Sequence, residues 1–381
     1  KRLNSPLLFE RWKMRVALVG DEYPPLTGGV ATYAAELSSF LSKLGVEVVV
    51  FTREGAEERE GVEVRGLKGF SVKNRFLSPF TFAELRRYLR SGDFSVVHGV
   101  DMYSSLALAA SRFARGKGIP SVLTCHSVHS SSGFWKAAYL PLSSFLKRAS
   151  RVVAVSGASK EFCLSLGVPE EKIRVIPNGV DLSLFHEGVD GREFRRRVGV
   201  GDGERLVATA IRLVKRKGPY LLLKAFEEVS REVPEVKLVI AGEGPEEGRL
   251  RREVEREGLK GRVKMLGRLP YPEVAKLMAG ADVFVLPSSL EAFGLAAVEA
   301  MAVGTPVVCP RAGGILEFAR EGYNCLFFEP GNPSSLKEVL LKLLSDSAMI
   351  KNLRRGGLET ARKFTWEKTA ELTLRLYEEI A

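Results

Sequence analysis

The chain has 381 residues, of which 45% are hydrophobic and 27% are charged, and its formal net charge is +11. This composition is that of a globular protein and excludes a collagen-like or disordered chain, while the length favours two domains over one. The longest apolar runs, such as 46–51, are too short to cross a bilayer and no secretory leader is recognisable, so we expect a cytoplasmic location.

Short β-branched runs, each followed by a stretch with helical periodicity, recur through the first half of the chain. They lie at 14–20, 46–51, 95–100, 121–126 and 151–156. Strands that alternate with helices are typical of a parallel sheet with helices on both faces. The first half therefore predicts one doubly wound α/β domain, which we assign to residues 1–185.

The second half repeats this plan and predicts a second Rossmann-like domain over residues 186–363. Its expected strands lie at 205–212, 236–242, 262–267, 281–287 and 305–310. Pro177, Asn178 and Gly179 interrupt the regular pattern between the two halves, and the junction is expected there. Residues 364–381 have the pattern of an amphipathic helix, which we expect to pack back on the N-terminal domain.

Two such sheets are expected to face each other across a cleft, because open parallel sheets bind ligands beyond the carboxyl ends of their strands. After the first expected strand, Gly28 and Gly29 form a turn without side chains directly before a helix. Backbone amides at such a turn are able to approach a phosphate or a sugar. The three spaced glycines of the dinucleotide-binding fingerprint are absent here.

Cations follow the first strand of the second half. Arg212 and Lys217 flank a short basic turn just before an expected helix that starts near Pro219. Two cations at the start of a helix suit a diphosphate, although the same cluster is also compatible with an ordinary solvated turn.

Two glutamates bracket the start of another expected helix. Glu291 precedes it and Glu299 lies within it, while Gly294 and Leu295 mark its first turn. Carboxylates accept hydrogen bonds from vicinal hydroxyls, and the free amides of a helix start suit a phosphate or sugar oxygen. Paired carboxylates also serve in hydrolysis, but hydroxyl binding is favoured because the sequence does not indicate the separation that hydrolysis requires.

His126 ends an expected strand of the first half and is a candidate to bond a sugar hydroxyl at the cleft edge, with a structural histidine as the alternative. The four cysteines lack metal-ligand spacing, which argues against a zinc site or a disulfide framework. Glutamine is absent while Lys, Arg and Glu abound, a bias seen in proteins of thermophiles.

Charge is unevenly distributed, since residues 1–185 carry 25 Lys and Arg against 17 Asp and Glu. The excess favours an anionic partner for the first half, such as membrane lipid, an acidic acceptor or nucleic acid. The stretches 73–90 and 134–151 mix aromatic and basic residues in helical patterns that suit either an anionic membrane surface or ordinary packing on the domain. No nucleic-acid recognition motif is present.

Several motifs in order resemble the family 4 retaining glycosyltransferases (glycosyl transferases group 1), whose architecture is called GT-B. The resemblance runs from about Met14 to the C-terminus and includes the strand-end His126. The matching stretches are EYPPLTGG at 22–29, AVSGASK at 154–160, IPNGVD at 176–181, RLVKRKG at 212–218, AGEGPE at 241–246 and EAFGLAAVEAMAVGTPVV at 291–308.

The resemblance implies a role for each candidate residue. Arg212 and Lys217 would bind the donor diphosphate, Glu299 the ribose hydroxyls, and Glu291 the hydroxyls of the transferred sugar. His126 would contact that sugar from the other domain. The remaining donor contacts would come from the Gly28–Gly29 loop, Arg268 beside the nucleobase, and the amides around Phe293, Gly294 and Leu295.

The same resemblance implies transfer of a hexosyl unit from a UDP- or GDP-sugar to a hydroxyl, with retention and without a metal or other cofactor. The acceptor would be lipid-linked, a sugar phosphate or a glycan, and the enzyme is compatible with a peripheral position on the inner membrane face. Two positions depart from the family pattern, Ile211 in place of a glycine and Cys325 in place of the glycine after Asn324. A non-hydrolysing sugar-nucleotide epimerase shares the architecture and is the alternative enzyme.

Overall fold

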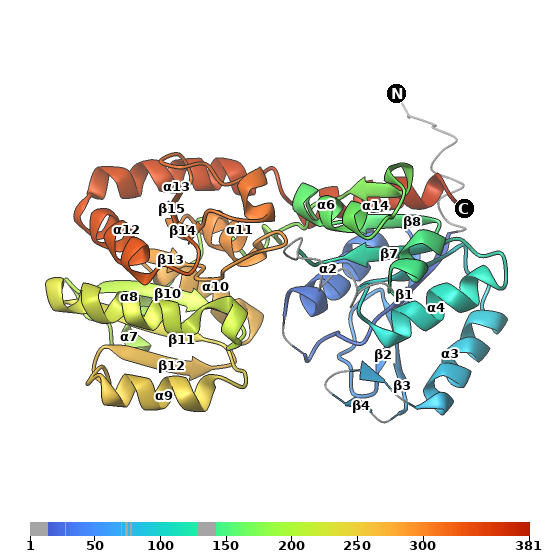
Figure 1. Cartoon of the computed structure of the whole chain (residues 1–381), viewed down its shortest axis with the longest axis horizontal. Helices are drawn as coiled ribbons and strands as arrows, with labels where there is room; N and C mark the ends of the chain where they lie inside the picture. The colour runs from blue at the N-terminus through green and yellow to red at the C-terminus, as the bar shows by residue number, and fades with distance from the viewer. Residues whose placement is uncertain (1–13, 27, 70, 73–74, 77, 129–141) are drawn as a thin grey trace. The chain divides into compact units, whose positions relative to one another are not determined.

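A computed structural model describes residues 14–26, 28–69, 71–72, 75–76, 78–128 and 142–381. The chain forms two compact units, coloured along the sequence in Figure 1. The N-terminal unit contains Lys1–Gly179 together with Trp366–Ala381, and the C-terminal unit is Val180–Thr365. The division after Gly179 lies at the predicted interruption 177–179, six residues before the end of the first domain as assigned from the sequence, residue 185.

The N-terminal unit is built on one sheet of parallel strands in the order β3-β2-β1-β6-β7-β8-β9. Nearly all residues of its central strands are buried, as expected for a parallel sheet covered on both faces. The strands are β1 (Arg15–Val19), β2 (Glu47–Arg53), β3 (Glu63–Leu67), β6 (Val96–Gly99), β7 (Ser121–Cys125), β8 (Arg151–Ala154) and β9 (Ile173–Val175). A separate antiparallel pair joins β4 (Ser71–Val72) and β5 (Arg75–Phe76).

Helices cover both faces of this sheet. On one face, α3 (Pro79–Ser91), α4 (Ser105–Arg115) and α6 (Gly157–Ser165) bury their apolar sides against the strands. On the other lie α2 (Gly29–Lys43) and α14 (Trp366–Glu378), which pack on each other. The last helix of the chain is therefore part of the first unit's core.

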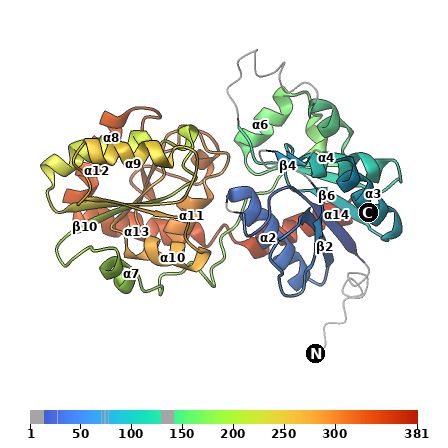
Figure 2. The same ribbon diagram turned by 90° about the horizontal axis from the view of Figure 1, so that it is seen from below.

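The C-terminal unit repeats the plan with parallel strands in the order β12-β11-β10-β13-β14-β15. They are β10 (Arg205–Ala210), β11 (Val236–Ala241), β12 (Val263–Gly267), β13 (Val283–Val285), β14 (Val307–Pro310) and β15 (Cys325–Phe328). Figure 2 shows α8 (Pro219–Glu232), α9 (Glu247–Arg256) and α12 (Pro333–Ser345) on one side of this sheet. On the other side lie α7 (Arg192–Arg197), α10 (Tyr271–Gly280), α11 (Leu295–Ala302) and α13 (Ser347–Ala361).

The predicted fold class, two doubly wound parallel-sheet α/β domains, is confirmed. A strand forms at each of the ten expected sites, and the sequence missed three edge strands, β3, β9 and β15. Both β3 and β9 mix charged with apolar residues, so their composition does not distinguish them from loops. Among the described residues, no helix is both long enough and apolar enough to cross a membrane.

Candidate functional site

The strand order of the C-terminal unit brings two loops together. From β10 the chain first builds outward through β11 and β12, and it then returns to place β13 on the other side of β10. Ligands of open α/β sheets bind at such a switch point, outside the carboxyl ends of the two strands. The loops that follow β10 and β13 carry Lys217 and Glu291 respectively.

Lys217 and Glu291 form an ion pair at this switch point. Lys217 Nζ donates to Glu291 Oε1 at 2.7 Å, although 74 residues separate them in the chain. Their side chains are 20% and 9% exposed, so both groups are largely removed from water. Separating a buried pair of this kind costs free energy, because each partner alone would be an uncompensated buried charge. This cost keeps the two side chains together.

Backbone contacts fix the two loops against each other. The Ser289 amide donates to Arg216 O at 3.2 Å, which joins the basic turn to the loop that precedes Glu291. Gly218 ends the turn with φ 69°. It lies so close to the loop after β13 that a Cβ atom at this position would be 2.0 Å from Pro287 O. Only glycine allows this approach, and the approach sets the position of Lys217.

Arg212 lies on the same loop after β10, with an exposed side chain. The AGEGPE stretch holds this loop, since the Leu213 amide donates to Glu243 O at 2.9 Å and the Glu246 amide donates to Leu213 O at 3.0 Å. The conformation of the loop is therefore defined by its neighbour. Ile211, which replaces the family's glycine, is buried without interrupting these bonds.

The loop after β13 runs into the first turn of α11. Gly294 caps this helix with φ 96° and ψ 46°, a left-handed conformation that favours glycine. The first amides of a helix have no intrahelical acceptor, so those at Gly294 and Leu295 are suited to bind an anion. The Phe293 ring is buried against Phe318 and Phe364, so this residue is placed to offer its backbone rather than its side chain.

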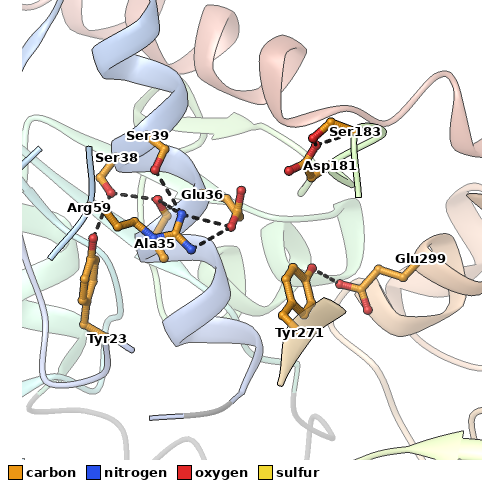
Figure 3. Close-up of polar contacts among 10 residues, drawn as sticks. All are labelled: Tyr23, Ala35, Glu36, Ser38, Ser39, Arg59, Asp181, Ser183, Tyr271 and Glu299. Carbon is orange, nitrogen blue, oxygen red and sulfur yellow. Dashed lines mark hydrogen bonds and ion pairs between the residues drawn. The ribbon is translucent and has the colours of Figure 1, made fainter. Parts of the chain in front are cut away.

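One turn into α11, Glu299 is only 5% exposed. The Tyr271 hydroxyl donates to Glu299 Oε1, as Figure 3 shows, and the Tyr271 ring packs edge-on against Phe185 with centroids 4.9 Å apart. Tyr271 was missed from the sequence; its position at the start of a helix directly after Pro270 was the available signal. Arg268, three residues earlier, has an exposed side chain.

In the N-terminal unit, the Gly28–Gly29 turn starts α2. Gly29 is exposed, and no described atom lies within 4 Å of where its Cβ would be, so the start of this helix is open. Arg59 fixes α2 from the side, because its Nη1 donates to Glu36 Oε1 at 3.1 Å and to Ala35 O at 3.1 Å (Figure 3). The turn thus sits on a helix that is anchored by a nearly buried carboxylate.

Asp21 lies at the switch point of the N-terminal sheet, beyond the carboxyl end of β1 and beside the paired strand β6. It follows β1, and its Oδ2 accepts a 2.8 Å bond from the Ser105 amide at the start of α4, after β6. Burial raises the pKa of Asp21 from 3.8 to about 6, although the bonds from Ser105 and Ser104 act in the opposite direction. This carboxyl was not among the candidate residues predicted from the sequence.

His126 directly follows β7 and is half-buried. Its Nε2 lies 3.0 Å from the carbonyl oxygen of Val100, which only accepts, so Nε2 carries the proton. Burial lowers the pKa of His126 from 6.5 to about 4, which leaves the ring neutral near neutral pH. In this tautomer Nδ1 is the acceptor, which suits a hydroxyl group.

A buried polar cluster surrounds His126. Its ring packs edge-on against Tyr33, with centroids 4.5 Å apart, and the Tyr33 hydroxyl lies 3.2 Å from Thr124 Oγ1. His98 Nε2 lies 2.6 Å from the same Thr124 oxygen, while its Nδ1 lies 2.5 Å from the Tyr377 hydroxyl. Burial lowers the pKa of His98 to about 3. His98 is thus a satisfied structural histidine that links α14 to the strands.

Two further expectations concern single positions. Asn324, in the second departure from the family pattern, is buried: its Nδ2 donates to Phe318 O and to Thr360 Oγ1, both at 2.8 Å. Its role is to hold the turn before β15, where Cys325 begins the strand. The four cysteines are buried and free, and no group of three or more His, Cys, Asp or Glu side chains that could bind a metal lies in the described part of the chain.

Some of the expected features lie partly outside the described residues. The stretch 134–151 is described only from residue 142, and within 73–90 the side chains are described only from residue 78. The extension before Met14 also lies outside. The structure unites Lys217 with Glu291 and Glu299 with Tyr271 within the C-terminal unit, while Gly28, Gly29 and His126 belong to the N-terminal unit.

Family profiles cover both units. The family "Glycosyltransferase Family 4" matches residues 27–184, and "Glycosyl transferases group 1" matches residues 190–360. Solved structures share the fold over 96% of this chain at low identity. Anabaena Alr3699/HepE in complex with UDP and glucose superposes with a TM-score of 0.83, at 20% identity and over 99% of that chain.

Curated relatives match over most of their length. The D-inositol 3-phosphate glycosyltransferase 1 of Catenulispora acidiphila is 30% identical, over 92% of this chain and 90% of the relative. The glycosyltransferase MJ1607 of Methanocaldococcus jannaschii is also 30% identical, over 96% and 98%. One component of the phosphatidylinositol N-acetylglucosaminyltransferase of Arabidopsis thaliana is 31% identical, over 96% and 82%. With the GT-B fold and these matches, the chain belongs to the family 4, group 1 glycosyltransferases.

Proposed function

We propose that this glycosyltransferase moves a hexosyl unit from a UDP- or GDP-sugar to a hydroxyl group, with retention at the anomeric carbon and without a metal ion. The observation that carries the proposal is the buried Lys217–Glu291 pair at the switch point, on the loop that leads to the uncapped first amides of α11. It combines a cation for a diphosphate with a carboxylate for sugar hydroxyls in one small region.

The donor occupies the C-terminal unit in this proposal. Lys217 and Arg212 bind the diphosphate, and Glu291 accepts hydrogen bonds from the hydroxyls of the hexosyl unit. The amides at Phe293, Gly294 and Leu295 bind phosphate or sugar oxygens. The fixed position of Glu291 supports this assignment, since the bond to Lys217 orients the carboxylate before the donor arrives.

The nucleoside is held farther along the same loop system. Glu299 accepts the two ribose hydroxyls, and Arg268 lies beside the base. Tyr271 supports the role of Glu299 because its hydroxyl bond restrains a carboxylate that is almost fully buried. A carboxylate in this position favours a ribose, which offers two neighbouring hydroxyl donors.

The reaction exchanges one bond to the anomeric carbon for another. The bond from this carbon to the diphosphate oxygen breaks, and the acceptor oxygen attacks from the same face. The acceptor's proton passes to the leaving diphosphate. Negative charge grows on the diphosphate as the bond breaks, so preorganised cations at Arg212 and Lys217 lower the barrier where a metal would otherwise be needed.

The N-terminal unit contributes hydroxyl contacts and binds the acceptor. His126 accepts a hydrogen bond from the transferred sugar through Nδ1, which its neutral tautomer supports. The amides of the Gly28–Gly29 turn, at the start of α2, bind donor phosphates in this proposal. Both features are uncharged, which is appropriate for a surface that must select hydroxyl groups.

The acceptor is proposed to be a phosphorylated polyol, either soluble or lipid-linked. Two relatives support this choice by name, one acting on D-inositol 3-phosphate and the other on phosphatidylinositol. The basic excess of the first 185 residues supports an anionic acceptor and contact with an anionic membrane surface on the cytoplasmic side.

A donor panel tests the reaction. UDP- and GDP-sugars are screened for thermal stabilisation in the presence of a metal chelator, since a ligand at a hundred times its Kd adds about 2.7 kcal/mol to the unfolding free energy. The stabilising donor is then incubated with inositol phosphate, and the anomeric configuration of the product is read by NMR. Retention with the chelator present is expected. An inverted product, a need for metal, or a donor sugar that rearranges without acceptor would contradict the proposal.

A further inference from the structure

A hollow lined by arginine and lysine lies on the outer face of the N-terminal unit. Its cavity, about 340 Å³, lies between the ends of α3 and α4. A small neighbouring cavity shares Arg112 with it and extends the hollow toward the helical residues 142–148. We call the two cavities the basic groove, and its cations are Arg86, Arg90, Arg112, Arg115, Lys117 and Arg148.

The cations of the basic groove are not neutralised within the part of the chain that the structure describes. None of the six forms an ion pair with a described residue, and no acidic residue lines either cavity. Three exposed arginines of the C-terminal unit differ. Arg231, Arg251 and Arg256 each pair with a glutamate on the same helix. Because these positive charges lie close together without counterions, they repel each other. An anion bound in the groove would relieve this repulsion.

The groove is separate from the catalytic end of its unit. Helix α4 begins at Ser105, after the carboxyl end of β6, and ends at Arg115, on the side of the amino ends of the strands. Gly29 and His126 lie at the carboxyl ends of the strands. Cations near a helix C-terminus are stabilised by the helix dipole, but this explains one cation at each helix end and not the convergence of cations from two helices on one cavity.

An exposed apolar residue lies at the start of α3, at the other end of this helix from the groove. Phe80 is 84% exposed, and the spacing of 80, 83, 87 and 90 places it on one face of the helix with Arg87 and Arg90. The Arg86 guanidinium lies 5.9 Å from the centroid of the Phe113 ring, which holds it at the rim of the cavity. An exposed aromatic ring on the same helix face as arginines suits the boundary between lipid headgroups and acyl chains.

We propose that the basic groove binds the phosphate groups of an anionic phospholipid bilayer, with Phe80 inserted among the lipids. The proposal rests on the membrane contact suggested under Proposed function and names the surface that makes it. Arginine forks recognise phosphate oxygens by paired hydrogen bonds, and several cations over one surface add their attractions. Phe80 favours a bilayer over a soluble phosphate, which would make no use of an exposed ring.

Vesicle sedimentation of the full chain tests the proposal. Vesicles of phosphatidylcholine with and without phosphatidylglycerol are compared for the wild type and for the triple variant Arg86→Gln, Arg90→Gln, Arg112→Gln. Each arginine lost should weaken partition to the anionic vesicles about 5-fold, and the triple variant about 100-fold. The matched control Arg231→Gln, Arg251→Gln, Arg256→Gln removes the same charge from exposed sites of the C-terminal unit and should stay within about 2-fold of the wild type.

Two further variants keep the test decisive. Arg112→Gln alone, which touches both cavities, replaces the triple variant if that protein does not fold. Phe80→Ser should weaken binding to vesicles and leave the affinity for inorganic triphosphate unchanged. Triphosphate binding that depends on the groove without vesicle binding would overturn the bilayer assignment in favour of a soluble phosphate.

The remaining outcomes separate this inference from the proposed reaction. If the triple variant sediments like the wild type, the groove is not the lipid site, although membrane contact stands. If the wild type ignores anionic vesicles at low salt, the groove and the membrane contact both fall. Sugar transfer to soluble inositol phosphate is measured in the same preparations, and its presence or absence decides the reaction independently of the vesicles.

Discussion

The two units share a fold and differ in how they treat polar groups at the ends of their strands. In the C-terminal unit the residues at the switch point are charged: Lys217 pairs with Glu291. In the N-terminal unit burial disfavours the charged forms instead: it raises the pKa of Asp21 to about 6, and it lowers that of His126 to about 4, which leaves this ring neutral near neutral pH. The same architecture therefore supports two different electrostatic environments.

This electrostatic difference indicates which part of a nucleotide sugar each unit is suited to bind. A diphosphate needs fixed positive charge, and its binding gains strength where that charge is partly shielded from water. A hydroxyl group instead needs a hydrogen-bonding partner of defined geometry, which His126 offers without a charge through its single tautomer. The contrast predicts that charge removal acts mainly on turnover in the C-terminal unit and mainly on stability in the N-terminal unit.

The largest effect is expected for Lys217→Ala. We expect kcat/KM to fall by about 100- to 1000-fold, or about 3–4 kcal/mol, because the cation acts most strongly on the charge that develops in the transition state. The thermal midpoint should also fall, since Glu291 keeps a buried carboxylate without its partner. Steady-state kinetics with the best donor measure the first effect, and calorimetry measures the second.

Lys215→Ala is the matched control, because Lys215 lies in the same short turn with an exposed side chain. This variant should keep kcat/KM within about 2-fold of the wild type. If a folded Lys217→Ala enzyme keeps near-normal turnover, Lys217 does not act on the diphosphate. The proposed link between the charged groups of the C-terminal unit and catalysis is then wrong.

The next effect concerns pH and the N-terminal unit. Asp21 has a folded pKa of about 6 against 3.8 in the unfolded chain, so its protonation stabilises the fold below pH 4, and this contribution is lost as the pH rises to about 6. Asp21→Asn keeps an acceptor for the Ser105 amide without the charge. The variant should match the wild type near pH 4 and exceed its unfolding free energy by up to about 3 kcal/mol above pH 6.

Denaturant unfolding at a series of pH values, with wild type and variant compared at each, checks this prediction. His98 and His126 titrate in the same range but are present in both proteins, so their contribution cancels in the difference. Asp93→Asn removes an exposed carboxylate from the same unit and serves as the control. A stability difference for Asp21→Asn that does not change with pH would show that burial does not raise the pKa of this carboxyl.

The architecture was predictable because it depends on local patterns. Runs such as 205–212 and 236–242 are apolar, β-branched and followed by helical periodicity, and each forms a strand of a parallel sheet. The strand β9 was not predictable in this way, since its three residues include Arg174 and its pairing with β8 depends on tertiary structure. Edge strands of this kind are specified by their neighbours rather than by their own composition.

The candidate site was predictable as a set of residue types and not as a set of contacts. Lys217 and Glu291 were each selected from their local setting, but their pairing depends on the order of β10 and β13 in the sheet. His98 and Tyr377 lie 279 residues apart, and no local pattern predicts that they meet. The roles of the residues in donor binding stay predictions, which variants at these positions are designed to test.

The smallest effect is expected for Tyr271→Phe, which tests whether the uncharged partner of a buried carboxylate matters for binding. The variant removes the hydroxyl that donates to Glu299 while keeping the ring against Phe185. We expect the donor Kd to rise about 5- to 10-fold, or about 1 kcal/mol, because Glu299 loses the bond that orients it toward the ribose. The value of kcat should change little, since the ribose does not take part in the bond exchange. Titration calorimetry measures the first quantity and initial rates the second.

Tyr220→Phe removes a hydroxyl that donates to the Glu246 backbone oxygen at 3.3 Å in the same unit, and it should leave both quantities unchanged. A fall in kcat with an unchanged Kd for Tyr271→Phe would place Tyr271 nearer to the reacting carbon than to the ribose. In that case the C-terminal unit would use hydrogen bonds as well as charge to lower the barrier, and the contrast with the N-terminal unit would be one of degree. A rise in Kd alone would keep the functions apart, with Lys217 acting on the leaving diphosphate and Tyr271 acting on recognition of the nucleoside.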